Sequence, residues 1–185
     1  IEPSNAFNKT IRLIYDANNV FDCELLSSNI VRIYPRNAGV SNLRLAFEDS
    51  YEDIDGVLVA TKYIDIRVKV ADGSELYPFE INNVSDLEEM VRDINSGANT
   101  YNYVIANNLN LSNYNYVAPT VEFNGGLDGL FQYELDGVRY SIQSNIINFG
   151  INVTDATETN VGLFKLLGES AIIKNLNLKY PEKNI

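Results

Sequence analysis

Carboxylates are the side chains of this sequence best placed to do chemistry, and their densest run lies between residues 48 and 56. Asp49, Glu52, Asp53 and Asp55 fall within it. Oxygen ligands crowded in this way can coordinate calcium. The spacing departs from that of an EF-hand loop. We therefore favour a solvated acidic loop between two strands, and a calcium site is the alternative.

A second set of carboxylates comprises Asp128, Glu134 and Asp136. Paired acids of this kind serve glycosidases and polysaccharide lyases. Asp128 and Asp136 each stand in a Leu-Asp-Gly sequence, however, which is typical of a turn. A lyase also needs a long substrate groove, for which this chain is short. We therefore expect no enzyme activity and no cofactor.

Tyrosines are the third candidate group, because the chain has 12 Tyr and no Trp. Tyr114 and Tyr116 lie in a polar segment, where exposed rings could bind a partner. Tyr101 and Tyr103 share one face of an expected strand, and for these we favour half-buried packing over binding.

Composition narrows the classes of function. Acidic residues outnumber basic ones by 25 to 14, so the net charge of −11 would repel a phosphate backbone, and we expect no nucleic acid partner. The absence of His removes the commonest zinc ligand and the usual general base. The single cysteine, Cys23, is two residues from both Phe21 and Leu25, so the three share one strand face, which predicts a packing role for Cys23.

The elements that position these residues are mostly strands. Up to Val70, short apolar runs alternate with turn residues at a spacing typical of a β-sandwich. The last run alternates strictly between apolar and charged residues, which predicts one face against a core. We expect strands at Thr10–Tyr15, Phe21–Leu26, Asn29–Tyr34, Val40–Phe47 and Tyr63–Val70.

One helix is expected, at about Asp86–Asn95. Ser85 and Glu88 form the pattern of a capping box, and Gly97 supplies a C-terminal stop. Apolar residues between them form a narrow stripe at helical spacing, so the helix should lie on a core. After it we expect strands at Tyr103–Leu111, Tyr140–Ile146 and Ile172–Leu178.

Asparagine is abundant, with 25 residues. A biased genome composition would produce this count without structural meaning, and we favour that explanation. The alternative is a stack of parallel coils, which uses Asn in left-handed turns or in side-chain ladders.

A motif lies between Asn160 and Leu178. It reads Gly-Leu-Phe at 162–164, then a turn containing Gly, then Ile-Lys-Asn-Leu-Asn-Leu at 173–178. This pattern resembles the GLUG repeat of bacterial surface proteins. Tyr103–Ser112 resembles the strand that precedes such repeats, and Phe123–Gly129 resembles the turn between them. The same order occurs in the non-catalytic N-terminal region of zinc metalloproteases that cleave immunoglobulin A, and the resemblance covers about Ile81–Tyr180.

The resemblance implies the start of a right-handed parallel β-helix on a secreted or wall-attached bacterial protein. Its first coil needs a cover, which the expected helix would supply. A second Leu-Asp-Gly within Leu130–Val138 leaves the register of the middle coil open. The first 70 residues resemble, more loosely, the immunoglobulin-like modules of bacterial surface proteins, on Ser27–Val31, Asn37–Leu43 and the strand ending at Val70.

We therefore expect a mainly β chain with an immunoglobulin-like β-sandwich at 1–72. Residues 73–185 should form a capping helix and the first coils of a parallel β-helix. The expected function is a non-catalytic, extracellular binding or spacer module of an adhesin-like cell-surface protein, whose partner is a host protein or a surface glycan. No apolar run is long enough to span a membrane. Because the sequence starts without Met, we expect a part of a longer protein.

Two alternative functions stay open. One is the substrate-positioning N-terminal region of a secreted zinc metalloprotease, whose catalytic site would lie downstream. The other is a carbohydrate-active β-helix enzyme.

Overall fold

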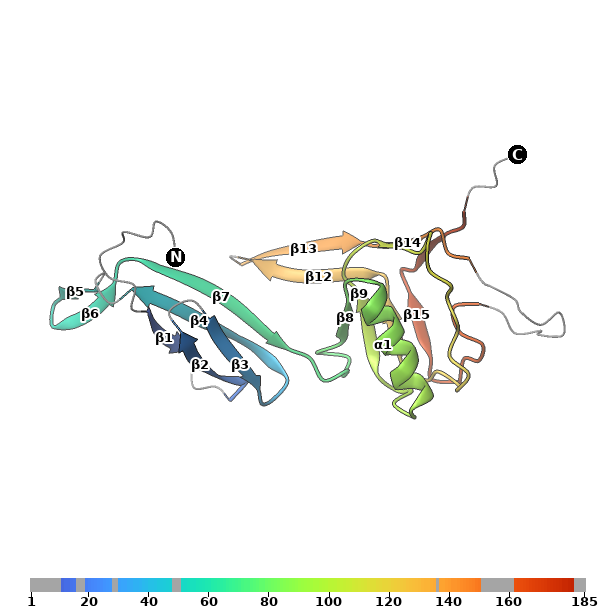
Figure 1. Cartoon of the computed structure of the whole chain (residues 1–185), viewed down its shortest axis with the longest axis horizontal. Coiled ribbons are helices and arrows are strands. Elements are labelled where there is room, and N and C mark those ends of the chain that lie inside the picture. The colour runs from blue at the N-terminus through green and yellow to red at the C-terminus, as the bar shows by residue number, and fades with distance from the viewer. Residues whose placement is uncertain are drawn as a thin grey trace. The chain divides into compact units, whose positions relative to one another are not determined.

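The computed structural model describes residues 11–15, 19–27, 30–47, 51–135, 137–150 and 162–181 (Figure 1). The described chain is mainly β, with one helix, which confirms the expected class. It divides into two compact units, Ile1–Asp72 and Gly73–Ile185, at the boundary expected from the sequence. Each unit has its own core.

The first unit consists of antiparallel strands. They form one sheet in the order β1-β4-β7 and two hairpins, β2-β3 and β5-β6. The immunoglobulin-like arrangement of these strands stays a prediction. The bounds are β1 (Ile11–Tyr15), β2 (Phe21–Ser27), β3 (Ile30–Pro35), β4 (Gly39–Phe47), β5 (Tyr51–Ile54), β6 (Val57–Ala60) and β7 (Tyr63–Val70).

The core of the first unit is small. Val20, Phe21 and Leu43 are buried, and Cys23 packs against them, which confirms its packing role. Partial burial raises the pKa of the Cys23 thiol, and the nearby Asp22 carboxylate adds to the rise. The thiol is therefore less reactive than an exposed one.

The apolar face of β7 is covered only in part. Val68 and Val70 pack against the core, whereas Ile64 is 53% exposed and Ile66 is 37% exposed. The expectation that the whole face lies against a core is therefore wrong. The cluster of Val20, Phe21 and Leu43 packs against the end of the strand that holds Val68 and Val70.

The described part of the acidic segment forms a hairpin rather than the expected loop. β5 and β6 pair directly across a two-residue turn at Asp55 and Gly56. Both turn residues have positive φ, 53° and 82°, as a type I′ turn requires. Asp53 Oδ1 accepts a hydrogen bond from the Gly56 N–H at 2.7 Å and so closes the turn. The Asp-Gly turn signal is present in the sequence, but the many acidic residues around it favoured the interpretation as a loop.

The second unit is built on two parallel sheets. The first has the order β15-β11-β9-β8 and the second has the order β10-β14-β16. The bounds are β8 (Phe79–Ile81), α1 (Val84–Asn95), β9 (Asn102–Ile105), β10 (Leu109–Asn110), β11 (Gly126–Asp128), β12 (Leu130–Leu135), β13 (Val138–Gln143), β14 (Asn145–Ile147), β15 (Ile172–Lys174) and β16 (Asn177–Lys179).

Each pass of the chain after α1 adds one strand to each parallel sheet. The first pass supplies β9 and β10, the second β11 and β14, and the third β15 and β16. Apolar residues of successive passes lie in register, Tyr103 with Leu127 and Ile173, and Leu109 with Ile146 and Leu178. They form one core with Leu87, Met90 and Ile94 of α1, which are fully buried.

Two expected elements of the second pass are different in the structure. Phe123–Gly129 was expected as a turn, but it contains β11. Gly125 allows the first and second passes to lie close together, because a Cβ there would lie 1.9 Å from the Tyr101 carbonyl oxygen. The expected strand Tyr140–Ile146 divides at Ser144 into β13, which is antiparallel to β12, and β14, which belongs to a parallel sheet.

Asparagines connect the passes through a side-chain ladder. Asn145 donates from its side chain to Asn108 Oδ1 at 2.9 Å, and Asn177 donates to Asn145 Oδ1 at 2.5 Å. Asn148 and Asn175 have positive φ, 55° and 53°. Each donates a side-chain hydrogen bond to a residue of the preceding pass, Asn148 to Asn110 and Asn175 to Asp128. These asparagines therefore have the turn and ladder roles that the second explanation of the asparagine count predicts.

Helix α1 begins two residues before its expected start. Its N-cap is Asn83, whose Oδ1 accepts a hydrogen bond from the Asp86 N–H at 3.1 Å. Asp86 Oδ2 accepts in turn from the Asn82 N–H at 2.8 Å. The capping role expected for Ser85 is therefore wrong, since Asn caps a helix as well as Ser does. The end at Asn95, followed by Gly97 with φ 101°, is as expected.

Within the described residues, no helix has the length and apolar character that crossing a membrane would need.

Candidate functional site

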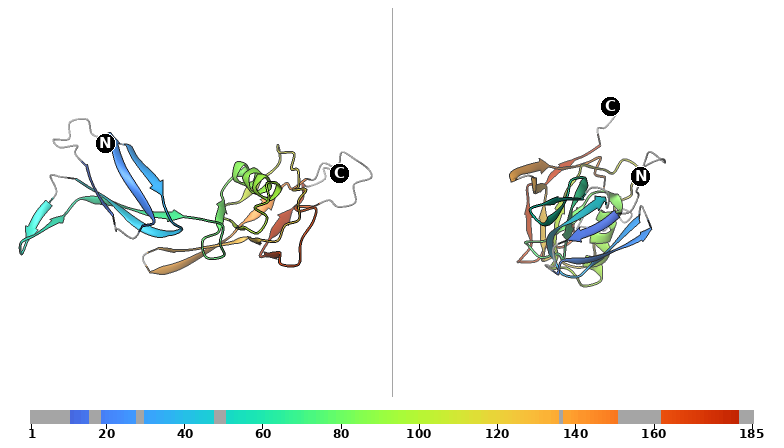
Figure 2. Two further views of the ribbon diagram at one scale, coloured as in Figure 1. Left: turned by 90° about the horizontal axis from the view of Figure 1, so that it is seen from below. Right: turned by 90° about the vertical axis from the view of Figure 1, so that its left-hand side faces the viewer.

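The hairpin β12–β13 interrupts an otherwise regular second pass. In the third pass, Lys174 and Asn177 are three residues apart, whereas their partners in the second pass, Asp128 and Asn145, are 17 apart. The hairpin, Leu130–Gln143, supplies the 14 residues of difference. It is therefore an insertion that leaves the register of both parallel sheets unchanged, and it projects from them as a separate ribbon (Figure 2).

One face of this hairpin is apolar and open to solvent. Its tyrosine and aliphatic residues from Tyr133 to Ile142 are between 37% and 53% exposed. Tyr133 stacks on Tyr140 across the strands, at a centroid distance of 5.2 Å, and on Phe131 at 5.7 Å. We call this surface the aromatic face, and it consists of Phe131, Tyr133, Leu135, Val138, Tyr140 and Ile142.

The opposite face of the hairpin is polar, because successive strand residues alternate between faces. Gln132 lies opposite Ser141, and Glu134 lies opposite Arg139, with which it forms an ion pair at 3.9 Å. Both sides of the ribbon are exposed, but only the aromatic face is apolar. Such a contiguous apolar surface is typical of an interaction site.

Gln143 fixes the base of the hairpin to the parallel sheets. Its Nε2 donates to the carbonyl oxygen of Asn175 at 2.6 Å and to that of Gly129 at 3.2 Å. Gly129 and Ser144, which flank the hairpin, are joined by a backbone hydrogen bond of 2.9 Å. The base of the hairpin is therefore closed by hydrogen bonds. These bonds fix the direction in which its two strands leave the parallel sheets.

A groove beside α1 is the second candidate. Its volume is about 310 Å³, and it lies between the helix, β8 and the start of β9. The helix contributes Asp86, Glu89, Met90 and Asp93, which share one face because of their spacing. We call it the α1 groove, and its lining is Phe79, Glu80, Ile81, Asp86, Glu89, Met90, Asp93, Tyr101 and Tyr103.

Tyr103 is the most deeply buried polar group of this groove. Its hydroxyl donates to Asp93 Oδ2 at 3.1 Å. Burial raises the pKa of Tyr103 well above its ordinary value, and the negative charges of Asp93 and Glu89 raise it further. The described residues that line the groove include four carboxylates and no Lys or Arg, so the formal charge of the lining is negative.

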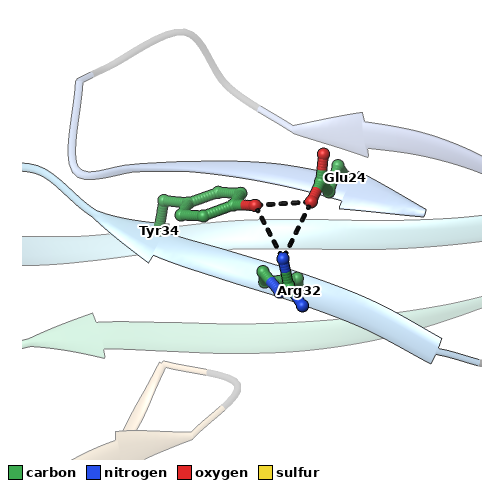
Figure 3. A network of polar contacts seen from close by, with 3 residues as sticks. All are labelled: Glu24, Arg32 and Tyr34. Atoms are coloured by element: carbon green, nitrogen blue, oxygen red, sulfur yellow. Dashed lines mark hydrogen bonds and ion pairs between the residues drawn. The ribbon is translucent and has the colours of Figure 1, made fainter. Parts of the chain in front are cut away.

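The third candidate is a polar cluster on the hairpin β2–β3 (Figure 3). Tyr34 donates a hydrogen bond to Glu24, and Arg32 approaches the Glu24 carboxylate to 3.5 Å. The bond to Glu24 raises the pKa of Tyr34. All three side chains are exposed, and Glu24 and Arg32 face each other across the strands. The cluster is a cross-strand surface contact, which contributes little stability.

The described acidic residues of the alternative calcium site are spread along the hairpin β5–β6. Glu52 and Asp53 are neighbours in one strand, so their side chains point to opposite faces. Asp55 stands in the turn, and Asp49 lies outside the described residues. No three ligating side chains of the described chain come together as a metal site would require. Calcium binding by this segment stays a prediction.

The expected partner-binding tyrosines lie in different environments. Tyr116 is only 1% exposed, and its hydroxyl donates to the Leu163 carbonyl oxygen at 2.6 Å. Its expected surface position is therefore wrong, because the polar residues around it in the sequence hide a core position. Tyr114 is half-buried, and it lies 6.4 Å from Tyr116 between ring centroids.

The carboxylates considered for the enzyme alternative have structural contacts or lie apart. Asp128 Oδ1 accepts from the Leu130 N–H at 2.9 Å, which confirms its role in a turn. Lys174 also lies 3.3 Å from its Oδ2. Glu134 is on the hairpin, and Asp136 lies outside the described residues.

Sequence reasoning missed both candidate surfaces. The strict alternation in Phe131–Leu135 and Val138–Ile142 around a Leu-Asp-Gly turn would have revealed the hairpin. The α1 groove has no local signal, since it joins Tyr101 to a helix that ends several residues before it.

Comparison of the chain with protein-family models, with curated proteins and with solved structures finds no match.

Proposed function

We propose that this chain is a non-catalytic binding module of a secreted or wall-attached, adhesin-like bacterial protein, and that the aromatic face is its binding surface. The observation that carries the proposal is the exposed apolar side of a hairpin inserted into regular passes. The proposed partner is a host protein or a surface glycan.

The regular passes support the architectural part of this proposal. We propose that they are the first coils of a right-handed parallel β-helix, with α1 as the cover of its first coil. The GLUG-like segment supplies β15 and β16 of the third pass, and the asparagine ladder holds the passes in register. The first unit, in this proposal, is an immunoglobulin-like spacer.

The position of the hairpin supports a binding role. In proteins made of stacked repeats, insertions collect on one face, and that face often binds the partner. The hairpin contributes no residue to the buried core of the second unit. Its exposed apolar residues therefore have no evident structural purpose, and they are unfavourable in water unless a partner covers them.

The chemistry of the aromatic face suits a protein or a sugar. Tyr133 and Tyr140 offer broad rings with few rotatable bonds, so ordering them on binding costs little entropy. Their hydroxyls can also accept or donate hydrogen bonds at the edge of a contact. Such residues dominate the binding energy of many interfaces.

The experiment measures binding of the full chain to immobilised matrix glycoproteins and to a glycan array. The double variant Tyr133→Ser/Tyr140→Ser removes the stacked pair. We expect at least one probe to bind the unchanged chain and to bind this variant about tenfold more weakly or worse.

The matched control is Gln132→Ala/Ser141→Ala, which changes the opposite face at neighbouring positions. It should bind as the unchanged chain does, and all three proteins should melt at similar temperatures. The proposal fails if no probe binds, or if the tyrosine variant binds as well as the control.

A further inference from the structure

The α1 groove combines two kinds of wall. Phe79, Tyr101 and Tyr103 give it aromatic surface, and the Phe79 ring lies 5.3 Å from Tyr101 and 5.9 Å from Tyr103 between centroids. Tyr101 is 36% exposed, so part of this aromatic surface can be reached from solvent. A cation that lies against such rings is attracted by their π-electrons.

Carboxylates surround the aromatic surface. Asp86, Glu89 and Asp93 come from one face of α1, and Glu80 comes from β8. Arg92 is the basic residue that lies nearest along the helix, and it approaches Glu89 only to 3.7 Å in an exposed pair. The lining of the groove therefore carries four carboxylates and no Lys or Arg, although Asp86 and Asp93 also accept hydrogen bonds within the chain.

These carboxylates do not converge on one point. Across the described chain, no three acidic or other ligating side chains are close enough to hold a metal ion. A metal ion needs several oxygens at about 2.0–2.6 Å. An organic cation with several separated N–H donors matches spread carboxylates better.

The size of the groove limits the cation. Pockets for drug-sized molecules have volumes of roughly 300–1,000 Å³, so a groove of about 310 Å³ suits one side chain rather than a larger ligand. A guanidinium group is planar, stacks on aromatic rings and carries five N–H donors in fixed directions. It can face the rings and bond carboxylates on two sides at once.

We propose that the α1 groove binds an arginine side chain that a partner polypeptide presents. The guanidinium stacks against Tyr101 and Phe79, and its N–H groups donate to Glu89 and to the neighbouring carboxylates. This site is separate from the aromatic face, and the inference does not depend on the function proposed for the hairpin.

The test uses the full chain labelled with ¹⁵N and the peptide acetyl-Gly-Arg-Gly-amide. Amide signals of β8, α1 and residues 101–103 are followed in NMR spectra as the peptide is added. We expect saturable shifts at these residues, with a dissociation constant in the millimolar range. The matching citrulline peptide, which has the same shape without the charge, should cause no such shifts.

Two variants locate the interaction. Glu89→Gln should weaken binding about fivefold, because it removes an exposed charge without disturbing the core. Tyr101→Leu should weaken binding about threefold through loss of the stacked ring. Glu169→Gln, which makes the same charge change at an exposed position outside the groove, should bind as the unchanged chain does.

Several results would overturn the inference. Shifts outside the groove, equal binding of the citrulline peptide, or equal effects of Glu89→Gln and Glu169→Gln would each do so. Equally tight binding of a lysine peptide would reject arginine as the ligand. Absence of shifts at about 20 mM peptide would reject the site, since millimolar binding is what one exposed side chain provides.

Discussion

Tyr103 and Tyr116 hold their hydroxyl groups inside the second unit. Each hydroxyl has one defined acceptor, Asp93 for Tyr103 and the carbonyl oxygen of Leu163 for Tyr116. Burial is the first cause that raises both pKa values above the ordinary 10.0. Both groups are therefore neutral in the folded protein under conditions where an exposed tyrosine ionises.

This difference predicts a loss of stability in alkali. The unfolded chain releases these two protons near pH 10, whereas the folded chain keeps them, so the folded state binds more protons. The free energy of unfolding is then unaffected by these groups below pH 10 and falls as the pH rises above it. Urea unfolding between about pH 8 and about pH 11 should show this fall.

The double variant Tyr103→Phe/Tyr116→Phe is the control for this prediction. It should be less stable at neutral pH, because the acceptors lose their donors, but its stability should fall less steeply above pH 10. Equal slopes for the two proteins would contradict the assignment.

At the scale of elements, the N-terminus of α1 offers a direct comparison of two caps. Asn83→Ala removes the acceptor for the Asp86 N–H and should lower the free energy of unfolding by about 1 kcal/mol. Ser85→Ala, at the cap expected from the sequence, should change it by less than about 0.5 kcal/mol. Urea unfolding of both variants decides between them, and a larger effect at Ser85 would contradict the observed cap.

The elements also show where sequence reasoning succeeds. Strands such as β4 and β7 were predicted because alternation is a local property of the chain. The end of α1 was predicted because Gly97 marks it within a few residues. The start was not, because Asn83 and Ser85 are both good caps and residue type does not distinguish them.

The candidate surfaces depend on longer-range facts. The groove needs Tyr101 beside α1, which follows from the parallel pairing of β8 with β9. The pairing of distant strands leaves no periodic signal in one sequence. The exposure of Ile64 and the burial of Tyr116 have the same origin, since residue type alone does not reveal what packs against it.

For the whole molecule, we predict that the fold tolerates deletion of the inserted hairpin. Deleting residues 130–143 joins Gly129 to Ser144, which correspond to the consecutive Asn175 and Leu176 of the third pass. The shortened chain should keep both parallel sheets, because the core loses none of its buried residues. Its free energy of unfolding should change by less than about 2 kcal/mol.

Circular dichroism and urea unfolding of the deletion variant check this expectation. Leu127→Ala is the comparison, because it truncates a fully buried residue of the same pass and should cost about 2–5 kcal/mol. Unfolding of the deletion variant, or a loss as large as that of Leu127→Ala, would show that the hairpin is part of the fold.

The closed base of the hairpin has a consequence for how such a chain can change over evolutionary time. Gly129 and Ser144 are already bonded to each other, so the segment between them can vary in length and sequence while the stacked passes keep their pairing. New specificities can then arise by exchange of this one ribbon, as antibody loops diversify on a constant framework. A protein engineer could use the same position to display a foreign hairpin.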